Sequence, residues 1–344
     1  MPDLLVRHGD LADCKLVDGE PRHESVGEGE AQLLVERLAL TTNNITYAVY
    51  GERLGYWKLF PAPEGWGRIP AWGYARVVGS GTAELPEGAR FFGMVPIGSH
   101  LTVRPAPQPF GFADVSPHRA DLSPVYNAYR TVEGDGEDAD LVMRPLFGTA
   151  VVLDLALTER GLDGVGTVVL TSGSSKTAYG LAHLLRGRPV ETVALTSRSR
   201  REWVEGLGIY DEVLTYDDVG ELRASGRVVL IDFAGDQALV HAVHEQLGDA
   251  LARSILVGFT HSRRESGVTP TPGPEPEFFF APYEIARRGR DFAQRYAEAW
   301  PDFAPVRERA LRIERITDAE QLLRVYRELL AGTADPSAGY VVSL

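Results

Sequence analysis

The sequence predicts a two-domain α/β protein, in which a β-rich domain is followed by a doubly wound parallel sheet. Three observations lead to this prediction. The chain has 344 residues, which is long for one hydrophobic core, so two domains are expected. Residues 70–104 contain short β-type segments separated by Gly and Pro. After Met143, strand and helix patterns alternate, and the strands are apolar almost throughout, as in a parallel sheet covered on both faces.

The elements of the β-rich domain are predicted from local patterns. Residues 31–50, AQLLVERLALTTNNITYAVY, begin with the alternation of a strand and end in a polar turn. Residues 70–104 are typical of a small, strongly bent sheet or barrel. Residues 105–125 are rich in Pro and predict a long irregular loop, whereas EGDGEDAD at 133–140 predicts a solvated surface turn.

The sheet domain is predicted over about residues 146–285, with residues 1–145 and about 286–344 together forming the β-rich domain. A helix over 145–161 is expected to end at Gly161, because glycine often follows a helix C-terminus. The alternating elements are strands at 167–172, 190–196, 212–215, 227–232 and 254–259, and helices at 175–186, 199–207 and 236–248. Helices are also expected at about 283–299 and 318–332, before a last strand at 339–344.

Composition limits the classes of partner. The net charge of −13 disfavours binding to nucleic-acid backbones and anionic membranes. The sequence has no run of about eighteen apolar residues and no signal-peptide pattern at its start. Its single cysteine, Cys14, excludes an internal disulfide and a multi-cysteine zinc site. We therefore expect a cytoplasmic protein that acts on a small molecule.

The segment VVLTSGSSKTAYG follows the first strand of the sheet domain. Gly173, Ser175 and Ala178 occupy the three places of the G-x-G-x-x-G pattern that binds a dinucleotide pyrophosphate. The backbone amides of residues 174–177, from Ser174 to Thr177, would open the next helix, whose N-terminus attracts anions. A triphosphate loop fits poorly, since Leu170 and Ser175 stand where it needs glycines. The segment would also suit an ordinary tight turn.

The end of the second strand bears on the choice of cofactor. Ser197 stands where an NAD site would place an acid, and Arg198, Arg200 and Arg201 follow it. Guanidinium groups bind phosphate in bidentate geometry, so this cluster favours NADP(H) over NAD(H). The alternative is a solvated basic helix start, although cations are unfavourable at a helix N-terminus.

Further segments of the sequence bear on ligand binding or on packing. LIDFAGD at 230–236 and ILVGFTH at 255–261 end later strands, where ligands of open α/β sheets bind. His241 and His244 match no zinc-protease spacing and predict a solvated helix face. SPVYNAYRTV at 123–132 either packs the Pro-rich insert or lines a substrate cleft, and residues 278–280, FFF, favour a core position over the nicotinamide end.

The order of these pieces resembles the medium-chain dehydrogenase/reductase superfamily, especially its zinc-free quinone oxidoreductase and enoyl reductase branch. TTNNITYAVYGERLGYW is similar to N-x-x-D…G-x-Y, and IPAWGYARVVGSGTAELPEGARFFGMVP is similar to P-x-x-x-G-x-E-x-x-G-x-V…G-D-R-V-x-G. GVGTVVLTSGSSKTAYG resembles the first βα turn, and GYVVSL resembles G-K-x-V-x-x. The tract FFFAPYEIARRGRDFAQRY and the 105–140 insert are similar to DUF2855-type members.

The resemblance implies a Rossmann-type NADP-binding domain and a GroES-like catalytic domain, with NADP(H) in the cleft between them. It implies an NADPH-dependent, zinc-independent reductase that transfers hydride to an activated C=C bond, in an enone or enoyl group, or to a quinone. A homodimer is compatible with it. The alternative is a non-catalytic NADP(H)-binding or partner-binding protein that keeps the fold, because Lys176 and Thr177 replace glycines that quinone reductases usually carry.

The resemblance also suggests site residues. Zinc is not expected, since Asn43 and Asn44 replace the family's Cys, and Gly73–Tyr74 replaces His–Glu. The proton donor would be Tyr56, with Tyr47 and Tyr126 as alternatives, and Asn44 would orient substrate or cofactor. The predicted cofactor-binding residues are Thr149, Gly173, Ser174, Ser175, Lys176, Thr177, Ser197, Arg198, Arg201, Tyr216, Phe233, Gly258, Phe259 and Phe279.

Overall fold

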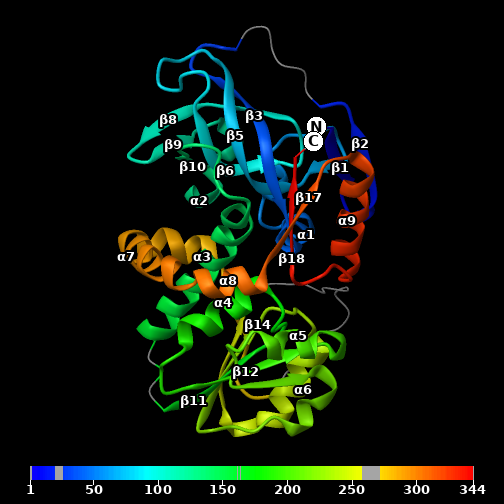
Figure 1. The fold of residues 1–344 in the computed structure, drawn as a ribbon, viewed down its shortest axis with the longest axis vertical. Coiled ribbons are helices and arrows are strands. Elements are labelled where there is room, and N and C mark those ends of the chain that lie inside the picture. Colours follow the sequence, from blue (N-terminus) through cyan, green and yellow to red (C-terminus); the bar gives the residue numbers. More distant parts are fainter. Residues whose placement is uncertain (1, 20–25, 161, 163, 258–271, 344) are drawn as a thin grey trace. The chain divides into compact units, whose positions relative to one another are not determined.

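A computed structural model describes residues 2–19, 26–160, 162, 164–257 and 272–343 (Figure 1). The chain divides into two compact units, Met1–Pro145 with Leu311–Leu344, and Leu146–Ala310. Helices α7 (Ala281–Asp302) and α8 (Ala304–Ala310) belong to the second unit, whereas the sequence analysis assigned residues from about 286 to the first. Aromatic packing accounts for the difference, because Phe303 stacks on Phe147 of the second unit with a centroid distance of 4.3 Å.

Two sheets form most of the first unit. The smaller has the order β2-β1-β4 and contains β1 (Asp3–Arg7), β2 (Asp10–Val17) and β4 (Trp66–Arg68). The larger has the order β17-β18-β3-β5-β6-β10-β9-β8, and β7 also pairs with β3. Its strands are β3 (Ala31–Leu40), β5 (Pro70–Ser80), β6 (Arg90–Pro96), β7 (His100–Val103), β8 (Pro105–Gln108), β9 (Gly111–Asp114), β10 (Ala128–Thr131), β17 (Arg312–Ile316) and β18 (Ala338–Val342). Only the β17–β18 pair in these two sheets, as described, is parallel.

Helices and short turns complete the first unit, and they correct two predictions of the sequence analysis. The predicted polar turn after β3 is helix α1 (Thr42–Val49), which begins with a capping box at Thr41. The predicted irregular loop at 105–125 contains β8, β9, the 3₁₀ turn η2 (Pro117–Arg119) and the start of α2 (Pro124–Asn127). The 3₁₀ turn η1 (Tyr56–Lys58) lies between α1 and β4.

The acidic segment at 133–140 is also not a simple solvated turn. Asp138 is the first residue of α3 (Asp138–Glu159), and its carboxylate pairs with Arg37 and, at 2.8 Å, with Arg315. Only 8% of the Asp138 side chain is exposed, because these two arginines cover it.

The second unit contains a six-stranded parallel sheet of order β13-β12-β11-β14-β15-β16. Its strands are β11 (Val165–Leu170), β12 (Glu191–Thr196), β13 (Glu212–Thr215), β14 (Arg227–Asp232), β15 (Leu251–Leu256) and β16 (Glu277–Phe278). In chain order the strands lie 3-2-1-4-5-6, the Rossmann arrangement, whose direction reverses between β11 and β14.

Alternate side chains of β12 point to opposite faces of the sheet, and they show which helices cover each face. Val193 and Leu195 of β12 pack in one cluster with α6 (Gln237–Leu247) and η4 (Tyr216–Glu221). Ala194, between them, packs in another cluster with α5 (Arg201–Gly206). Helix α4 (Lys176–Leu185) follows β11, and η3 (Arg198–Arg200) follows β12. The sheet is therefore buried on both faces, as its continuous apolar strands predict.

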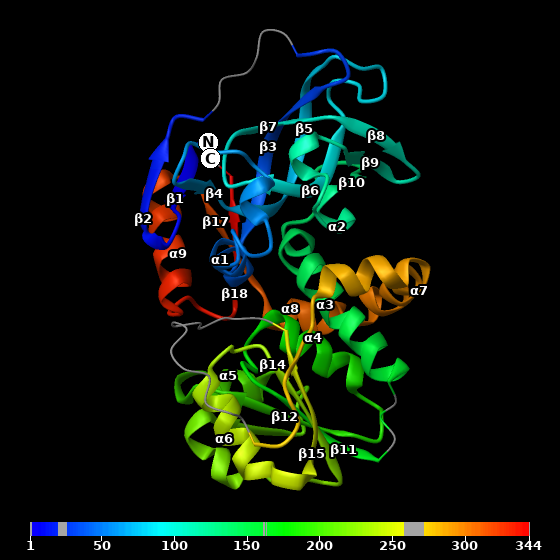
Figure 2. The same cartoon turned by 180° about the vertical axis from the view of Figure 1, so that it is seen from behind.

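Helices α3 and α9 are each held by contacts with the rest of the structure. Helix α3 is long and apolar enough to cross a bilayer, but 67% of its most apolar window is buried inside the structure, as in the core helix of a soluble protein. It starts earlier than predicted, at Asp138 rather than near Pro145. Helix α9 (Ala319–Ala331) lies beside β2 in the first unit (Figure 2), and its Tyr326 hydroxyl donates to the carbonyl of Leu11 at 2.7 Å.

Candidate functional site

The carboxyl ends of β11 and β14 meet at the point where the strand order reverses. Here the Thr171 hydroxyl donates to Asp232 Oδ1 at 2.5 Å. The Thr171 hydroxyl oxygen also accepts the amide hydrogens of Phe233, at 2.9 Å, and Ala234, at 3.0 Å. Thr171 therefore connects two neighbouring strands through three hydrogen bonds, and it fixes the edge of the sheet at which Rossmann folds bind their ligands.

Asp232 is a buried carboxyl in this edge. Its oxygens also accept the amide hydrogens of Ala234, at 3.1 Å, and Gly235, at 3.0 Å. Burial raises the pKa of Asp232 to about 6, and the hydrogen bonds from Thr171 and the two amides oppose that increase. The carboxyl is thus fully used in holding the turn after β14.

The loop between β11 and α4 has an unusual backbone. Ser172 has a φ of 50°, and it is the one non-glycine residue with positive φ in the described part of the chain. The amide of Ser175 donates to the Ser172 carbonyl at 2.7 Å, which closes the turn. At Gly173 a Cβ atom would lie 2.7 Å from the Cβ of Ala194, so this glycine is needed for close packing against β12.

Ser175, at the second glycine place, is the N-cap residue of α4. Its hydroxyl accepts the amide hydrogen of Ala178 at 3.2 Å, so its side chain turns back onto its own helix. Lys176 and Thr177 are the first two residues of α4, and both are half-buried. The helix N-terminus therefore lies directly behind the loop, as an anion site requires.

The three arginines after β12 have different partners. Arg198 lies 3.3 Å from the carboxylate of Asp217. Arg201 pairs with Glu205 at 2.8 Å and lies 3.7 Å from Asp218. Arg200, which is not among the predicted cofactor-binding residues, instead donates from Nη1 to the Ser174 hydroxyl at 3.3 Å. Of the three, Arg200 is the one recorded in contact with the loop after β11.

The remaining predicted cofactor residues lie in several places. Ser197 precedes η3, and its hydroxyl is 3.2 Å from that of Ser199. Tyr216 is hydrogen-bonded to Ser172, and burial raises its pKa to about 12. Phe233 and Phe279 are buried, whereas Phe278 is 53% exposed. Thr149 is half-buried on α3, and Gly258 and Phe259 lie outside the described residues.

The three tyrosines predicted as proton donors come together in the first unit. They reach one place from three segments: Tyr47 from α1, Tyr56 from η1 and Tyr126 from α2. The hydroxyls of Tyr56 and Tyr126 are 2.8 Å apart, and the rings of Tyr47 and Tyr56 have a centroid distance of 4.8 Å. All three are buried. We call this group the phenol cluster.

Two nitrogen donors approach the third hydroxyl of the phenol cluster. Asn43 Nδ2 donates to Tyr47 Oη at 2.7 Å, and Trp72 Nε1 donates to it at 3.1 Å. Burial raises the pKa of all three tyrosines, that of Tyr56 to about 12, whereas the two N–H donors act to lower the pKa of Tyr47. The three side chains are therefore neutral at ordinary pH.

Asn44 has its hydrogen bonds within the chain. Its Oδ1 accepts the Thr41 amide hydrogen at 2.6 Å, and its Nδ2 donates to the Pro70 carbonyl at 2.7 Å. It is 2% exposed. In this structure Asn44 fixes the start of α1 and so the position of Tyr47.

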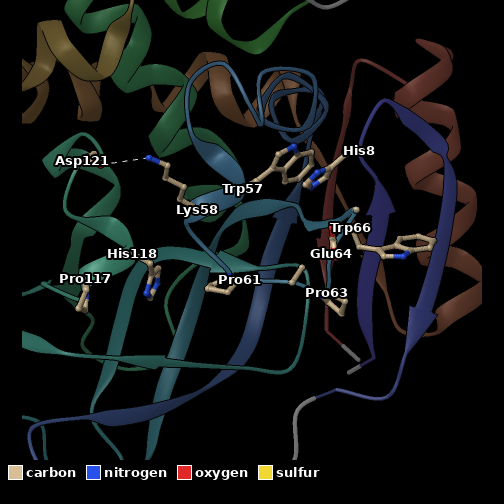
Figure 3. A pocket seen from close by; sticks show the side chains of 12 residues that line it. His8, Trp57, Lys58, Pro61, Pro63, Glu64, Trp66, Pro117, His118 and Asp121 are labelled. Atoms are coloured by element: carbon tan, nitrogen blue, oxygen red, sulfur yellow. Dashed lines mark ion pairs between the residues drawn. The ribbon is translucent and has the colours of Figure 1, made fainter.

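The first unit also contains a hollow of about 590 Å³ (Figure 3). Trp57 and Lys58 of η1 line it, whereas the preceding Tyr56 belongs to the phenol cluster. Its charged groups are mixed in sign, since Lys58, which lies 3.5 Å from Asp121, lines it together with Asp121 and Glu64. The hollow therefore favours no single charge of ligand.

The histidines of α6 differ from the predicted solvated face. His241 lies 3.3 Å from Glu245, but His244 is buried, with Nε2 2.9 Å from the Ser254 hydroxyl and Nδ1 2.7 Å from the Pro272 carbonyl. The prediction was wrong for His244, because the helix turns that side chain onto β15. Within the described residues, no group of three or more His, Cys, Asp or Glu could hold a metal ion.

A comparison with protein families matches residues 38–335 to the family described as "Protein of unknown function (DUF2855)". The chain belongs to the DUF2855 family. A search of curated proteins gives no match.

Solved structures show that this DUF2855 chain has the fold of medium-chain reductases over its whole length. CurA from Vibrio vulnificus, in complex with NADPH, matches with a TM-score of 0.66 at 13% identity, covering 100% of this chain and 99% of CurA. The YhdH oxidoreductase from Salmonella enterica, in complex with NADP, matches with a TM-score of 0.56 at 16% identity and full coverage of both chains. A mutant enoyl thioester reductase from Candida tropicalis gives 0.58 at 12% identity, with 100% and 99% coverage. The predicted fold class and resemblance are confirmed.

The structure adds residues to the two candidate regions that the sequence did not single out. Thr171 links β11 to β14, and its only sequence signal was its place at the end of the predicted strand 167–172. Asp232 lay in the noted segment LIDFAGD, without a stated role. Trp72 reaches Tyr47 from β5, 25 residues away, and no local pattern could have paired them.

Proposed function

We propose that this DUF2855 protein binds NADP(H) and reduces an activated C=C bond or a quinone without zinc. The observation that carries the proposal is the edge at β11 and β14, where the strand order reverses beside the N-terminus of α4. Its structural neighbours include CurA in complex with NADPH and YhdH in complex with NADP, which supports the choice of cofactor. The proposal includes a small electrophilic substrate, a cytoplasmic location and a homodimer.

The residues of the second unit suit a dinucleotide. The N-terminal end of α4 offers a partial positive charge to a pyrophosphate, and Ser175 leaves room there because its hydroxyl is turned onto Ala178. Lys176, in the first turn of α4, would add a cation. Thr171 and Asp232 keep the strand ends fixed, so binding would not have to order them.

For the 2′-phosphate we assign the main contact to Arg200 rather than to Arg198 or Arg201. Arg198 and Arg201 face carboxylates, and a phosphate would have to compete with Asp217, Asp218 and Glu205 for them. Arg200 contacts a neutral hydroxyl, that of Ser174. Arg200 therefore lies against the loop after β11, and a guanidinium there can bind phosphate through two hydrogen bonds.

The chemistry divides between cofactor and chain. When bound, a reduced nicotinamide supplies hydride to an electrophilic carbon. The chain must then provide hydrogen-bond donors for the enolate or quinolate charge and a proton to complete the reduction. The hydroxyls of the phenol cluster are the candidates for that proton.

Ligand binding followed by turnover tests the proposal. The protein would be titrated with NADPH, NADH and ATP, and then mixed with NADPH and a panel of enones, enoyl thioesters and quinones in a stopped-flow instrument. We expect saturable NADPH binding that is tighter than NADH binding, and oxidation of NADPH by at least one electrophile. Absence of nucleotide binding would refute the proposal.

A second function remains a candidate because Lys176 and Thr177 replace the usual glycines of the loop. In that case the protein would bind NADP(H) without turnover. Saturable NADPH binding with no oxidation across the whole panel would favour it.

A further inference from the structure

The three hydroxyls of the phenol cluster do not have equivalent partners. Tyr56 and Tyr126 share one hydrogen bond at 2.8 Å, in which one hydroxyl donates and the other accepts. Tyr47 Oη instead accepts from Asn43 Nδ2 and Trp72 Nε1. An indole N–H and an amide NH₂ group are donors only. The two lone pairs of the Tyr47 oxygen are therefore occupied by N–H groups.

The hydrogen of the Tyr47 hydroxyl has no acceptor among the residues that the structure describes. A buried hydroxyl without an acceptor loses a hydrogen bond that it would make in water. A ligand oxygen placed against this hydroxyl would restore that bond. An oxygen that becomes negatively charged would accept it more strongly than a neutral carbonyl.

Burial raises the pKa of Tyr47, and the two N–H donors act against that increase. As the O–H bond weakens, negative charge develops on the phenol oxygen, and the fixed donors of Asn43 and Trp72 stabilise that charge. The structure records no N–H donor at the hydroxyls of Tyr56 and Tyr126, which bond to each other. Of the three phenols, Tyr47 is the one whose oxygen accepts two N–H donors and whose hydrogen is left for a ligand.

We propose that Tyr47 is the proton donor of the reductase and that Asn43 and Trp72 are positioning residues that stabilise its phenolate. This inference rests on the proposed function. After hydride reaches the electrophilic carbon, the O–H bond of Tyr47 breaks and its proton forms a new bond to the enolate or quinolate. The phenolate, held by the two N–H groups, then takes a proton from water.

The hydrogen bond from Trp72 to Tyr47 can be removed without removing the packing of its ring. Its ring stacks on Phe92 with a centroid distance of 5.4 Å, and its Nε1 alone reaches Tyr47. Trp72→Phe would keep an aromatic side chain against Phe92 and remove the N–H. Tyr47→Phe likewise keeps the ring and removes the hydroxyl.

The first measurement needs no cofactor. The full chain would be titrated with 4-nitrophenolate, an oxyanion that resembles the charge of an enolate, and its absorbance band followed. We expect saturable binding that weakens about tenfold in Tyr47→Phe and about threefold in Trp72→Phe. Tyr56→Phe should weaken it less than twofold, and Tyr283→Phe, at a 62% exposed residue, should not change it. If the wild-type chain binds no probe, or binds it equally well without the Tyr47 hydroxyl, the inference is wrong.

The second measurement uses turnover with NADPH and the best electrophile of the panel. General acids contribute about 100-fold or more, so Tyr47→Phe should lower kcat about 100-fold while NADPH affinity stays within twofold. Trp72→Phe should lower kcat about fivefold, leave KM unchanged and enlarge the solvent deuterium isotope effect, which a packing defect would not do.

The outcomes separate the two proposals. A 100-fold loss in Tyr56→Phe, with little loss in Tyr47→Phe, would move the donor role to Tyr56 and leave the reductase proposal intact. Probe binding that depends on Tyr47, in a chain that binds no NADPH, would support the hydrogen-bond donor and refute the reductase.

Discussion

The edge of the parallel sheet and the phenol cluster are both buried polar groups at the ends of secondary-structure elements, but they are completed in different ways. At the sheet edge, Thr171 Oγ1 donates one hydrogen bond and accepts two, and both oxygens of Asp232 accept. In the phenol cluster, Tyr47 accepts two hydrogen bonds and, within the described structure, donates none. A complete network holds a shape, whereas an incomplete one leaves a group for a ligand.

The largest expected effect comes from breaking the complete network. Thr171→Val keeps the shape of the side chain but removes the hydroxyl, which accepts from the amides of Phe233 and Ala234 and donates to Asp232. We expect a loss of about 3 kcal/mol in the free energy of unfolding, since buried unsatisfied groups cost about 1–3 kcal/mol each. Denaturant unfolding would measure it.

Thr46→Val is the matched control for that measurement. The Thr46 hydroxyl makes only a 3.5 Å contact to the Thr42 carbonyl within α1. Its loss should cost no more than about 0.5 kcal/mol. Equal losses of stability in the two variants would show that the hydrogen bonds of Thr171 do not stabilise the fold more than an ordinary threonine hydroxyl does.

The next effect concerns the charge of Asp232. Its pKa is raised from 3.8 to about 6 in the folded chain, so folding favours the protonated carboxyl. The stabilisation from this group is present below about pH 4 and is lost as the pH rises towards 6 and above. By linkage we expect a change on the order of 2 kcal/mol.

Asp232→Asn isolates this contribution. The difference in unfolding free energy between wild type and the variant should decline between pH 4 and pH 7, as wild type alone pays for ionisation. The comparison would be made by denaturant titrations at several pH values. A difference that stays constant with pH would contradict the raised pKa.

A smaller effect is expected beside the phenol cluster. Asn44→Ala removes the hydrogen bonds to the Thr41 amide and the Pro70 carbonyl, and so loosens the start of α1. We expect a loss of about 1–2 kcal/mol in stability, as for other helix caps. Because α1 carries Tyr47, kcat should fall by a few fold without a change in NADPH affinity. A loss of NADPH affinity instead would give Asn44 a cofactor contact.

The two regions also differ in how far the sequence predicts them. The sheet edge follows from local order, because a strand, a small loop and a helix occur within residues 165–185 and their types determine the topology. The family resemblance predicts the three tyrosines one by one, but their contact depends on how α1, η1 and α2 pack together. Tyr56 and Tyr126, whose hydroxyls share a hydrogen bond, are 70 residues apart in the sequence. No local sequence pattern predicts a contact between segments so far apart.

The partners of the three arginines were likewise not predictable from the sequence. The cluster after β12 was evident in the sequence, but not which arginine would face the loop and which would face Asp217 or Glu205. The φ of 50° at Ser172 was equally hidden, since serine does not signal positive φ as glycine does.

The smallest predicted effect separates the arginines of the sheet edge. Arg200→Ala should weaken NADPH binding about tenfold, or about 1.4 kcal/mol, and leave NADH binding nearly unchanged, because only NADPH carries the 2′-phosphate. Arg198→Ala is the matched control, since Arg198 is 79% exposed and faces Asp217, and it should weaken NADPH binding less than threefold. Both affinities would be measured by fluorescence titration at one fixed salt concentration, because screening weakens every such contact. A larger loss of NADPH affinity in Arg198→Ala than in Arg200→Ala would place the 2′-phosphate beside Asp217, where Arg198 would have to leave its carboxylate. An equal loss of NADH affinity in Arg200→Ala would instead mean that Arg200 acts through Ser174 on the loop itself.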